Sequence, residues 1–513
     1  MSQSRYPQYN WRQSKHNHWE REVDEAECFY ASLAKSYEGS GRMFFAITGF
    51  VSISVDLTNG SIGQDVEDAL LDYDKERGKY FKTYNSFDPA HLDFHTESWL
   101  SDTFISITPN MHGLDWCNSD PLAPRVPTLF VITPPYSNDS RKGTVNLDLV
   151  FRSPHDIIDG IGTLQLLNKL LVTAARYHAD PSSFELPLPG SECQNLSPPL
   201  RVAALIPPIL TLDQQERLQN TISSNAALRQ DAELLSVPFT QGEKVPGKHQ
   251  RAALGLSIGD TNLALQACKA LGTTVTHAYH ASIALLLRDL RPSRTEARAA
   301  RYINYCLVNE RPNCAAPYST PDHAAAVYHS VSGTSLALDL TIPSGADRFK
   351  DHPSDAKEAQ KEFRTLVDQV RDFYTSIRNS PENLALAPSF WSMATPHIAN
   401  PTSKWSLNTP VPAPNQSPSV SLSSMGKLDN VIAPQHGAFS TKNPWVTGEE
   451  LGTGIGVFLG TWQGQLQLSA AYNEAWHDRE EVRGFLERCC GIVWKGLGLG
   501  DGTNHVPKVE WVH

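Results

Sequence analysis

The chain contains 513 residues, of which 40% are hydrophobic and 19% are charged. This composition is typical of a folded protein with a large core and, at this length, predicts two or three domains. The 44 basic and 55 acidic side chains give a net charge of −11, which argues against nucleic acid or an anionic membrane as a partner. Apolar runs such as 283–287 are too short to span a bilayer.

The N-terminal segment has no apolar core of the kind that a secretory signal contains. The eight cysteines are too few for a disulfide scaffold, and none forms a Cys-x-x-Cys pair. We therefore expect reduced thiols and a cytoplasmic location.

The first part of the chain predicts strands followed by a helix. Residues 42–57, 129–133 and 145–151 are rich in β-formers. After the third of these strands comes the loop sequence SPHDIIDG, and over 161–179 apolar residues recur at helical spacing. Prolines then crowd the chain up to residue 212, which indicates a crossover between two halves.

The second part of the chain mixes strands and helices. We expect a helix capped by Asp260 and ending at Ala270, followed by further helices, strands and one loop. These are a helix over 276–290, strands over 301–311 and 335–340, a charged helix over 354–377, a loop over 394–418, strands over 455–462 and 466–473, and a closing helix over 480–497. Without a regular β-α-β alternation, the pattern predicts a two-part α/β protein, divided into 1–185, a linker over 186–212, and 213–513.

The strongest candidate for chemistry is the segment from His155 to Gly160. A histidine directly after a strand lies where loops carry functional groups, and a neutral imidazole can remove a proton near pH 7. Asp159 can fix the loop by pairing with an arginine, and Gly160 permits a backbone conformation closed to other residues. The residues alone leave a second interpretation open, in which Asp159 caps an ordinary helix and His155 is a turn residue.

The pattern H-x-x-x-D-G after a strand resembles the acyltransferase superfamily that includes chloramphenicol acetyltransferase, the plant HxxxD acyltransferases and peptide-synthetase condensation domains. The segments 271–287, SLSSMGKLDNVI at 421–432 and GTWQGQLQLSAAYNEAWHD at 460–478 are similar to later parts of those proteins, in the same order. Within the superfamily the sequence most resembles fungal secondary-metabolite O-acetyltransferases, above all the trichothecene 15-O-acetyltransferases, in GRMFFAITGF and TFISITPNMHGLDWCNSDP. Two departures are visible: the segment 66–81 is abbreviated, and Pro154 stands where condensation domains carry another histidine.

The resemblance implies a fold of two chloramphenicol-acetyltransferase-like α/β subdomains, a pseudo-dimer with an active-site tunnel between them. It implies that His155 is the general base, that Asp159 is structural, and that Arg311 is its partner. Ser423, Ser424 and the Gly426 amide are candidates for the oxyanion site, although the serines can equally be read as groups that complete a strand end.

By the same resemblance, the expected reaction is acetyl transfer from acetyl-CoA to a hydroxyl of a trichothecene or related terpenoid. Acetyl-CoA acts as a co-substrate, no cofactor is permanently bound, no metal is needed, and a monomer is expected. Two alternatives stay open: a carrier-protein-dependent enzyme that forms an ester or amide, and a non-catalytic scaffold of the same fold.

Weaker signals compete with this interpretation. Residues 255–259 satisfy G-x-S-x-G, the nucleophile motif of serine hydrolases, after a weak strand. His277 and His280 share a helix face as metal ligands would, but no third ligand falls at a matching offset. The glycines at 452, 454 and 456 miss the dinucleotide spacing. Trp116, Trp391 and Trp405 are candidates to line an acceptor pocket.

Overall fold

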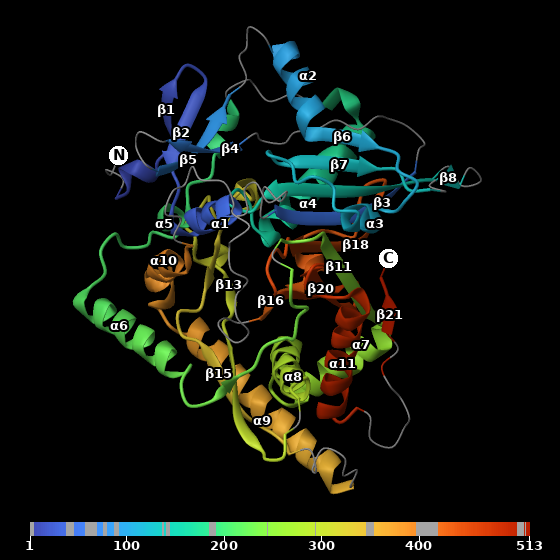
Figure 1. Ribbon diagram of the computed structural model, residues 1–513. Coiled ribbons are helices and arrows are strands. Elements are labelled where there is room, and N and C mark those ends of the chain that lie inside the picture. Colours follow the sequence, from blue (N-terminus) through green and yellow to red (C-terminus); the bar gives the residue numbers. More distant parts are fainter. Residues whose placement is uncertain are drawn as a thin grey trace.

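The computed structural model describes most of the chain. The described residues are 5–36, 46–56, 69–74, 79–86, 92–135, 138–139, 144–183, 191–243, 245–292, 294–344, 353–396, 419–499, 507 and 509–512. Figure 1 shows two groups of strands with helices against them, the first built mainly from the earlier chain and the second mainly from the later chain. The candidate motif lies where these two groups meet.

A seven-stranded sheet organises the first group. Its strand order is β17-β18-β3-β9-β7-β6, and β8 pairs with β9. The bounds are β3 Ala46–Asp56, β6 Phe104–Ile107, β7 Thr128–Ile132, β8 Asn138–Asp139, β9 Thr144–Pro154, β17 Gln435–His436 and β18 Phe439–Gly448. β18 comes from the late chain yet pairs with β3 along most of its length, so the two halves share a sheet.

Helix α4, Gly160–Ala179, covers one face of this sheet. Its apolar residues Leu164, Leu167 and Leu171 are buried against the strands, as the helical spacing of the sequence predicts. The other face contacts α3, Gly113–Asn118, and α2, Leu92–Thr103, lies beside β6 and β7. The strand–loop–helix unit predicted around the motif is therefore present.

A smaller sheet lies beside the first, with the order β1-β2-β5-β4. The bounds are β1 Arg12–Lys15, β2 His18–Glu22, β4 Ala69–Asp74 and β5 Lys79–Asn85. The segment that looked abbreviated in the sequence thus contributes the antiparallel pair β4 and β5. Helix α1, Glu25–Ser36, follows β2 directly.

The second group contains a five-stranded sheet in the order β16-β19-β20-β11-β21. The bounds are β11 His249–Leu256, β16 Val420–Lys427, β19 Ile455–Trp462, β20 Gln465–Asn473 and β21 Val509–Trp511. One core joins this sheet to the helices α7 Ile258–Ala270, α8 Val275–Asp289, α9 Pro353–Arg378 and α11 Arg479–Gly496. Helix α8 is buried along most of its length, in agreement with the apolar run 283–287 in its sequence.

The remaining elements connect these layers. A three-stranded sheet has the order β10-β12-β15, and β13 pairs with β14. The bounds are β10 Glu233–Leu234, β12 Arg298–Asn304, β13 Leu307–Asn309, β14 His329–Val331, β15 Leu336–Ile342, α5 Leu200–Ala203, α6 Leu212–Ala227 and α10 Asn383–Ala394, with short 3-10 turns η1 Pro7–Tyr9, η3 Pro181–Ser183, η4 Ser191–Asn195, η5 Arg311–Asn313, η6 Pro321–His323 and η7 Leu428–Asn430.

Most predicted elements agree with the structure to within a few residues, and two details are wrong. The strand predicted over 301–311 is two strands, β12 and β13, that belong to different sheets. Helix α7 is capped by Ser257, whose hydroxyl accepts from the Asp260 amide, and not by Asp260 itself. The loop predicted over 394–418 lies almost entirely outside the described residues.

Candidate active site

His155 is the first residue after β9, in the loop that leads into α4. Because β9 pairs with β3 on one side and β7 on the other, the strand fixes where this loop begins. The side chain is buried, and burial together with the nearby His329 lowers the pKa of His155 to about 4. The imidazole is therefore neutral at physiological pH, the form that accepts a proton.

Aromatic side chains surround the imidazole. The ring of Tyr30, on α1, stacks on that of His155 with centroids 3.9 Å apart and planes 9° from parallel. The Tyr30 hydroxyl lies 2.8 Å from Nε2 of His329 on β14, and Trp391 meets His329 edge to face at 5.5 Å. Neither Tyr30 nor His329 stands out in the sequence, because the two are 299 positions apart.

Trp116 and Trp391, two of the tryptophans predicted to line an acceptor pocket, pack in different clusters. Trp391 is 3% exposed and packs among Phe29, Tyr30 and His329, so it lies behind the aromatic cluster. Trp116, on α3, packs on Phe130 at 4.7 Å, and Trp405 lies outside the described residues. The expectation that these tryptophans line an acceptor pocket stays a prediction.

Asp159 and Arg311 are in direct contact. Nη1 of Arg311 lies 2.8 Å and 2.7 Å from the two carboxylate oxygens, and both residues are buried. The carboxylate also accepts from the amides of Gly162 and Tyr328, each at 2.8 Å. Burial alone would raise the pKa of Asp159, but Arg311 and His329 together lower it well below its usual range. Asp159 thus caps α4 and joins it to the late chain.

The contact between Asp159 and Arg311 requires a glycine at position 162 and not at position 160. A Cβ at Gly162 would lie 2.1 Å from the carbonyl oxygen of Ala324 and 2.8 Å from Nη2 of Arg311. Gly160 has no positive φ, and a Cβ there would touch Val446 and Met425 at 3.3 and 3.4 Å, which is tight but not forbidden. The expectation that Gly160 adopts a conformation closed to other residues is therefore wrong.

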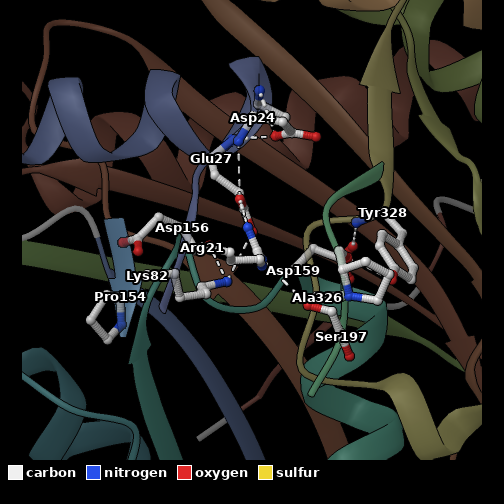
Figure 2. Close-up of polar contacts among 12 residues, drawn as sticks. Arg21, Asp24, Glu27, Lys82, Pro154, Asp156, Asp159, Ser197, Ala326 and Tyr328 are labelled. Carbon is white, nitrogen blue, oxygen red and sulfur yellow. Dashed lines mark hydrogen bonds and ion pairs between the residues drawn. The ribbon is translucent and has the colours of Figure 1, made fainter. Parts of the chain in front are cut away.

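A second buried group of charges lies behind the loop (Figure 2). Glu27 of α1 accepts from both Nη atoms of Arg21, at 2.7 and 2.6 Å, and from Nζ of Lys82 at 2.9 Å. Lys82 also donates to the backbone carbonyl of Asp156 at 3.1 Å. Although burial opposes ionisation, the two cations lower the pKa of Glu27 to about 2. The group ties β2, β5 and α1 to the residue that follows His155.

The Asp156 carboxyl is buried with few hydrogen bonds. Its Oδ2 atom is buried and has no hydrogen-bond partner among the described residues, and burial raises its pKa from 3.8 to about 6. Because its pKa is raised from 3.8 to about 6 in the folded state, the Asp156 carboxyl destabilises the fold increasingly as the pH rises through this range, and above pH 6 the penalty is constant.

Asp156→Asn is therefore expected to raise the free energy of unfolding by about 1 to 3 kcal/mol at pH 8. The gain should largely disappear at pH 4, where the wild-type carboxyl is protonated in the folded protein. Denaturant unfolding at both pH values measures the difference. Asp102→Asn, on the exposed side of α2, is the control and should show no such pH dependence, whereas the absence of a gain at pH 8 in Asp156→Asn would contradict the prediction.

The oxyanion candidates lie on β16. The Ser424 hydroxyl is 2.8 Å from that of Thr276 on α8, and the Ser423 hydroxyl approaches the Met425 sulfur at 3.7 Å. Gly426 lies at a strand irregularity with φ +68°, a conformation that glycine adopts without strain. Met425, between them, comes within 3.4 Å of where a Gly160 side chain would be, so β16 lies near the start of α4.

The competing motifs have structural partners. The Ser257 hydroxyl of G-x-S-x-G bonds to the amide and the carboxylate of Asp260 at the start of α7, so it is a helix cap. His277 contacts Thr273, and His280 contacts Tyr374. Within the described ranges, no group of three or more metal-ligating side chains comes together, and no helix has both the length and the apolar character needed to cross a membrane.

Comparison with known proteins shows which sequences and structures the chain resembles. No family model matches the chain. The O-acetyltransferase pigM of Monascus ruber is 25% identical over 353 residues, which are 68% of this chain and 62% of that protein, so the match spans less than two thirds of that relative. The acetyltransferase pigO of the same fungus is 20% identical over 514 residues, 96% of this chain and 99% of that protein.

Solved structures show the same fold. The TRI3 trichothecene 15-O-acetyltransferase from Fusarium sporotrichioides matches with a TM-score of 0.72 at 15% identity, over 95% of this chain and 98% of its own. The first condensation domain of the CDA synthetase matches with a TM-score of 0.55 at 13% identity, over 96% and 98%. The predicted fold class is confirmed. The chain therefore has the fold of these acetyltransferase and condensation-domain structures, and the two sequence relatives are both acetyltransferases.

Proposed function

We propose that the chain transfers an acetyl group from acetyl-CoA to the hydroxyl of a small alcohol, with His155 as general base. The observation that carries this proposal is a buried, neutral imidazole directly after β9, beside an aspartate that is committed to Arg311 and two amides. Because Arg311 and the two amides hold the Asp159 carboxylate, we assign proton exchange with the substrates to the His155 imidazole.

The reaction balances with His155 as the only proton carrier. The imidazole takes the hydroxyl proton as the alcohol oxygen attacks the thioester carbon, which forms a C–O bond and a tetrahedral oxyanion. Collapse of this intermediate breaks the C–S bond, and the imidazolium returns the proton to the sulfur of CoA. The products are an ester and free CoA, and no acyl-enzyme is formed. Ser423, Ser424 and the Gly426 amide are our candidates for donors to the oxyanion.

For the acceptor we propose a trichothecene or a related fungal terpenoid with a free hydroxyl of the C-15 type. Support comes from the likeness to TRI3 and to the two Monascus acetyltransferases. The test is incubation of the protein with acetyl-CoA and a 15-hydroxy trichothecene, with thiol release and product mass as readouts. Stoichiometric release of CoA with an acetylated product is the expected result.

Other outcomes of this assay point to the alternatives. Product formed only from an acylated carrier protein, and not from free CoA, would support a condensation-type enzyme. Binding of the acceptor without turnover of any donor would support a scaffold. The predicted monomer, the cytoplasmic location and the lack of a permanently bound cofactor stay predictions.

The lowered pKa of His155 predicts an unusual pH profile. Because the imidazole stays neutral down to about pH 4, kcat/KM should stay level from pH 8 to pH 5 and fall only below that range. An ordinary histidine, with a pKa near 6.5, would lose about fivefold between pH 6.5 and pH 5.5. Circular dichroism at each pH verifies that the protein is folded, and an inflection near pH 6.5 would contradict the assignment.

A further inference from the structure

We propose that Tyr30 and His329 are positioning residues for His155, Tyr30 by stacking on the imidazole and His329 by holding the Tyr30 hydroxyl. The inference rests on the proposed function and adds to it two residues outside the HxxxDG motif. The contacts that carry it come from three separate elements, α1, β14 and the loop before α4.

The stacking contact defines the plane of the imidazole. Tyr30 is 8% exposed, its ring lies 3.9 Å from that of His155, and the planes are 9° apart. Tyr30 cannot turn freely, because Trp391 packs on its ring at 5.8 Å and His329 binds its hydroxyl at 2.8 Å. The base is therefore presented to substrate with its ring plane fixed.

The same contact favours the protonated form that arises during the reaction. His155 is neutral before the reaction and becomes an imidazolium when it takes the hydroxyl proton. A cation over the face of an aromatic ring is stabilised by the negative potential of that face, and more so in a dry site. This stabilisation arises only once the imidazole carries its positive charge. It therefore lowers the free energy of the transition state more than that of the bound substrate, and it raises kcat.

His329 fixes the hydroxyl of Tyr30. Nδ1 of His329 faces Asp159, with 3.7 Å between Nδ1 and Oδ2, which is too long for a hydrogen bond but favours the proton on Nδ1. With the proton on Nδ1 alone, Nε2 accepts from the Tyr30 hydroxyl, 2.8 Å away, and in the doubly protonated ring Nε2 donates to the hydroxyl oxygen, so one hydrogen bond joins the two in either state. Burial raises the pKa of Tyr30 well above 10, so the hydroxyl keeps the proton that it donates.

These contacts form one chain of residues from Arg311 to the base. Arg311 holds Asp159, Asp159 orients His329, His329 holds Tyr30, and Tyr30 stacks on His155. The titratable groups that face His155 and Tyr30 are His329 from β14, Asp159 from the start of α4, and Tyr305 from between β12 and β13. A change in the pKa of His155 in a variant must therefore be interpreted together with the charges of these three groups.

The experiment uses the full chain and three variants. Tyr30→Leu removes the ring, Tyr30→Phe keeps the ring and removes the hydroxyl, and His329→Asn removes the imidazole that holds it. Phe29→Leu is the matched control, because Phe29 is next to Tyr30 and packs on the same Trp391. We measure kcat and KM for acetyl-CoA, and the ring-proton resonances of His155 in histidine-labelled protein, assigned with His155→Gln.

We expect Tyr30→Leu to lower kcat about tenfold while KM stays within about twofold, since the lost interaction is with the charged base. The upfield shift that the stacked ring gives to His155 should disappear in Tyr30→Leu, persist in Tyr30→Phe and decrease in His329→Asn. Tyr30→Phe should keep most of kcat, and Phe29→Leu should keep both readouts.

Two results would overturn the inference: an unchanged His155 resonance and kcat in Tyr30→Leu, or the same losses in Phe29→Leu. If the wild-type protein does not turn over acetyl-CoA, the proposed function fails, and the resonances alone then decide whether Tyr30 positions His155.

Discussion

Replacement of His155 by alanine is expected to lower kcat/KM for acetyl transfer by about a hundredfold or more, because a positioned general base contributes about 10²- to 10⁴-fold. The alcohol would then have to lose its proton to water in a buried site. The protein should stay folded, since the variant deletes a neutral side chain in a loop whose position is fixed by β9 and by the contacts of Asp159. Thiol release and product mass, followed under identical conditions in both proteins, measure the loss.

His178→Ala is the matched control for this variant. His178 lies near the end of α4 and packs on Phe439 at 5.7 Å, so its removal deletes an imidazole from the helix that follows the motif without touching the motif. Turnover in His178→Ala should equal that of the wild type to within about twofold. A His155→Ala protein that keeps activity to within about threefold would refute the general-base mechanism.

The second large effect concerns stability. Arg311→Met should destabilise the protein by about 3 to 5 kcal/mol, because it leaves Asp159 as a buried charge without its cation. Asp159 accepts four of the contacts at the start of α4, two from Arg311 and two from amides. The loop that carries His155 should loosen with it, so activity should fall as well. Denaturant unfolding, with the slope compared between proteins, gives the change.

An exposed ion pair supplies the control. Arg301 bonds to Asp339 at 2.6 Å, but the Asp339 side chain is 72% exposed, and such pairs contribute about 0 to 1 kcal/mol. Arg301→Met should therefore cost far less than Arg311→Met. In the double variant Asp159→Asn/Arg311→Met, part of the lost stability should return, because no buried charge is left unpaired. Equal costs for the two single variants would show that the Asp159–Arg311 pair does not hold the loop.

The sequence was most informative where structure is local. The strand, loop and helix around His155 follow from a β-rich run, a turn and a helical repeat of apolar residues, all within 35 positions of each other, from 145 to 179. The predicted partner of Asp159 came from the family resemblance, since nothing in the spacing connects residues 152 positions apart. The predicted strand over 301–311 failed because its continuous β-rich pattern does not show that the chain changes sheets after Asn304.

By itself, then, the sequence determined the fold class, the order of most elements and the motif that carries the candidate base. Only the tertiary structure decided what surrounds that base. Tyr30 and His329 are joined to His155, and Lys82 to the residue after it, by contacts that arise when distant elements pack together. Periodicity reports which face of an element is buried, but it does not report which side chain a buried group will meet. The protonation state of His155 depends on that second kind of information.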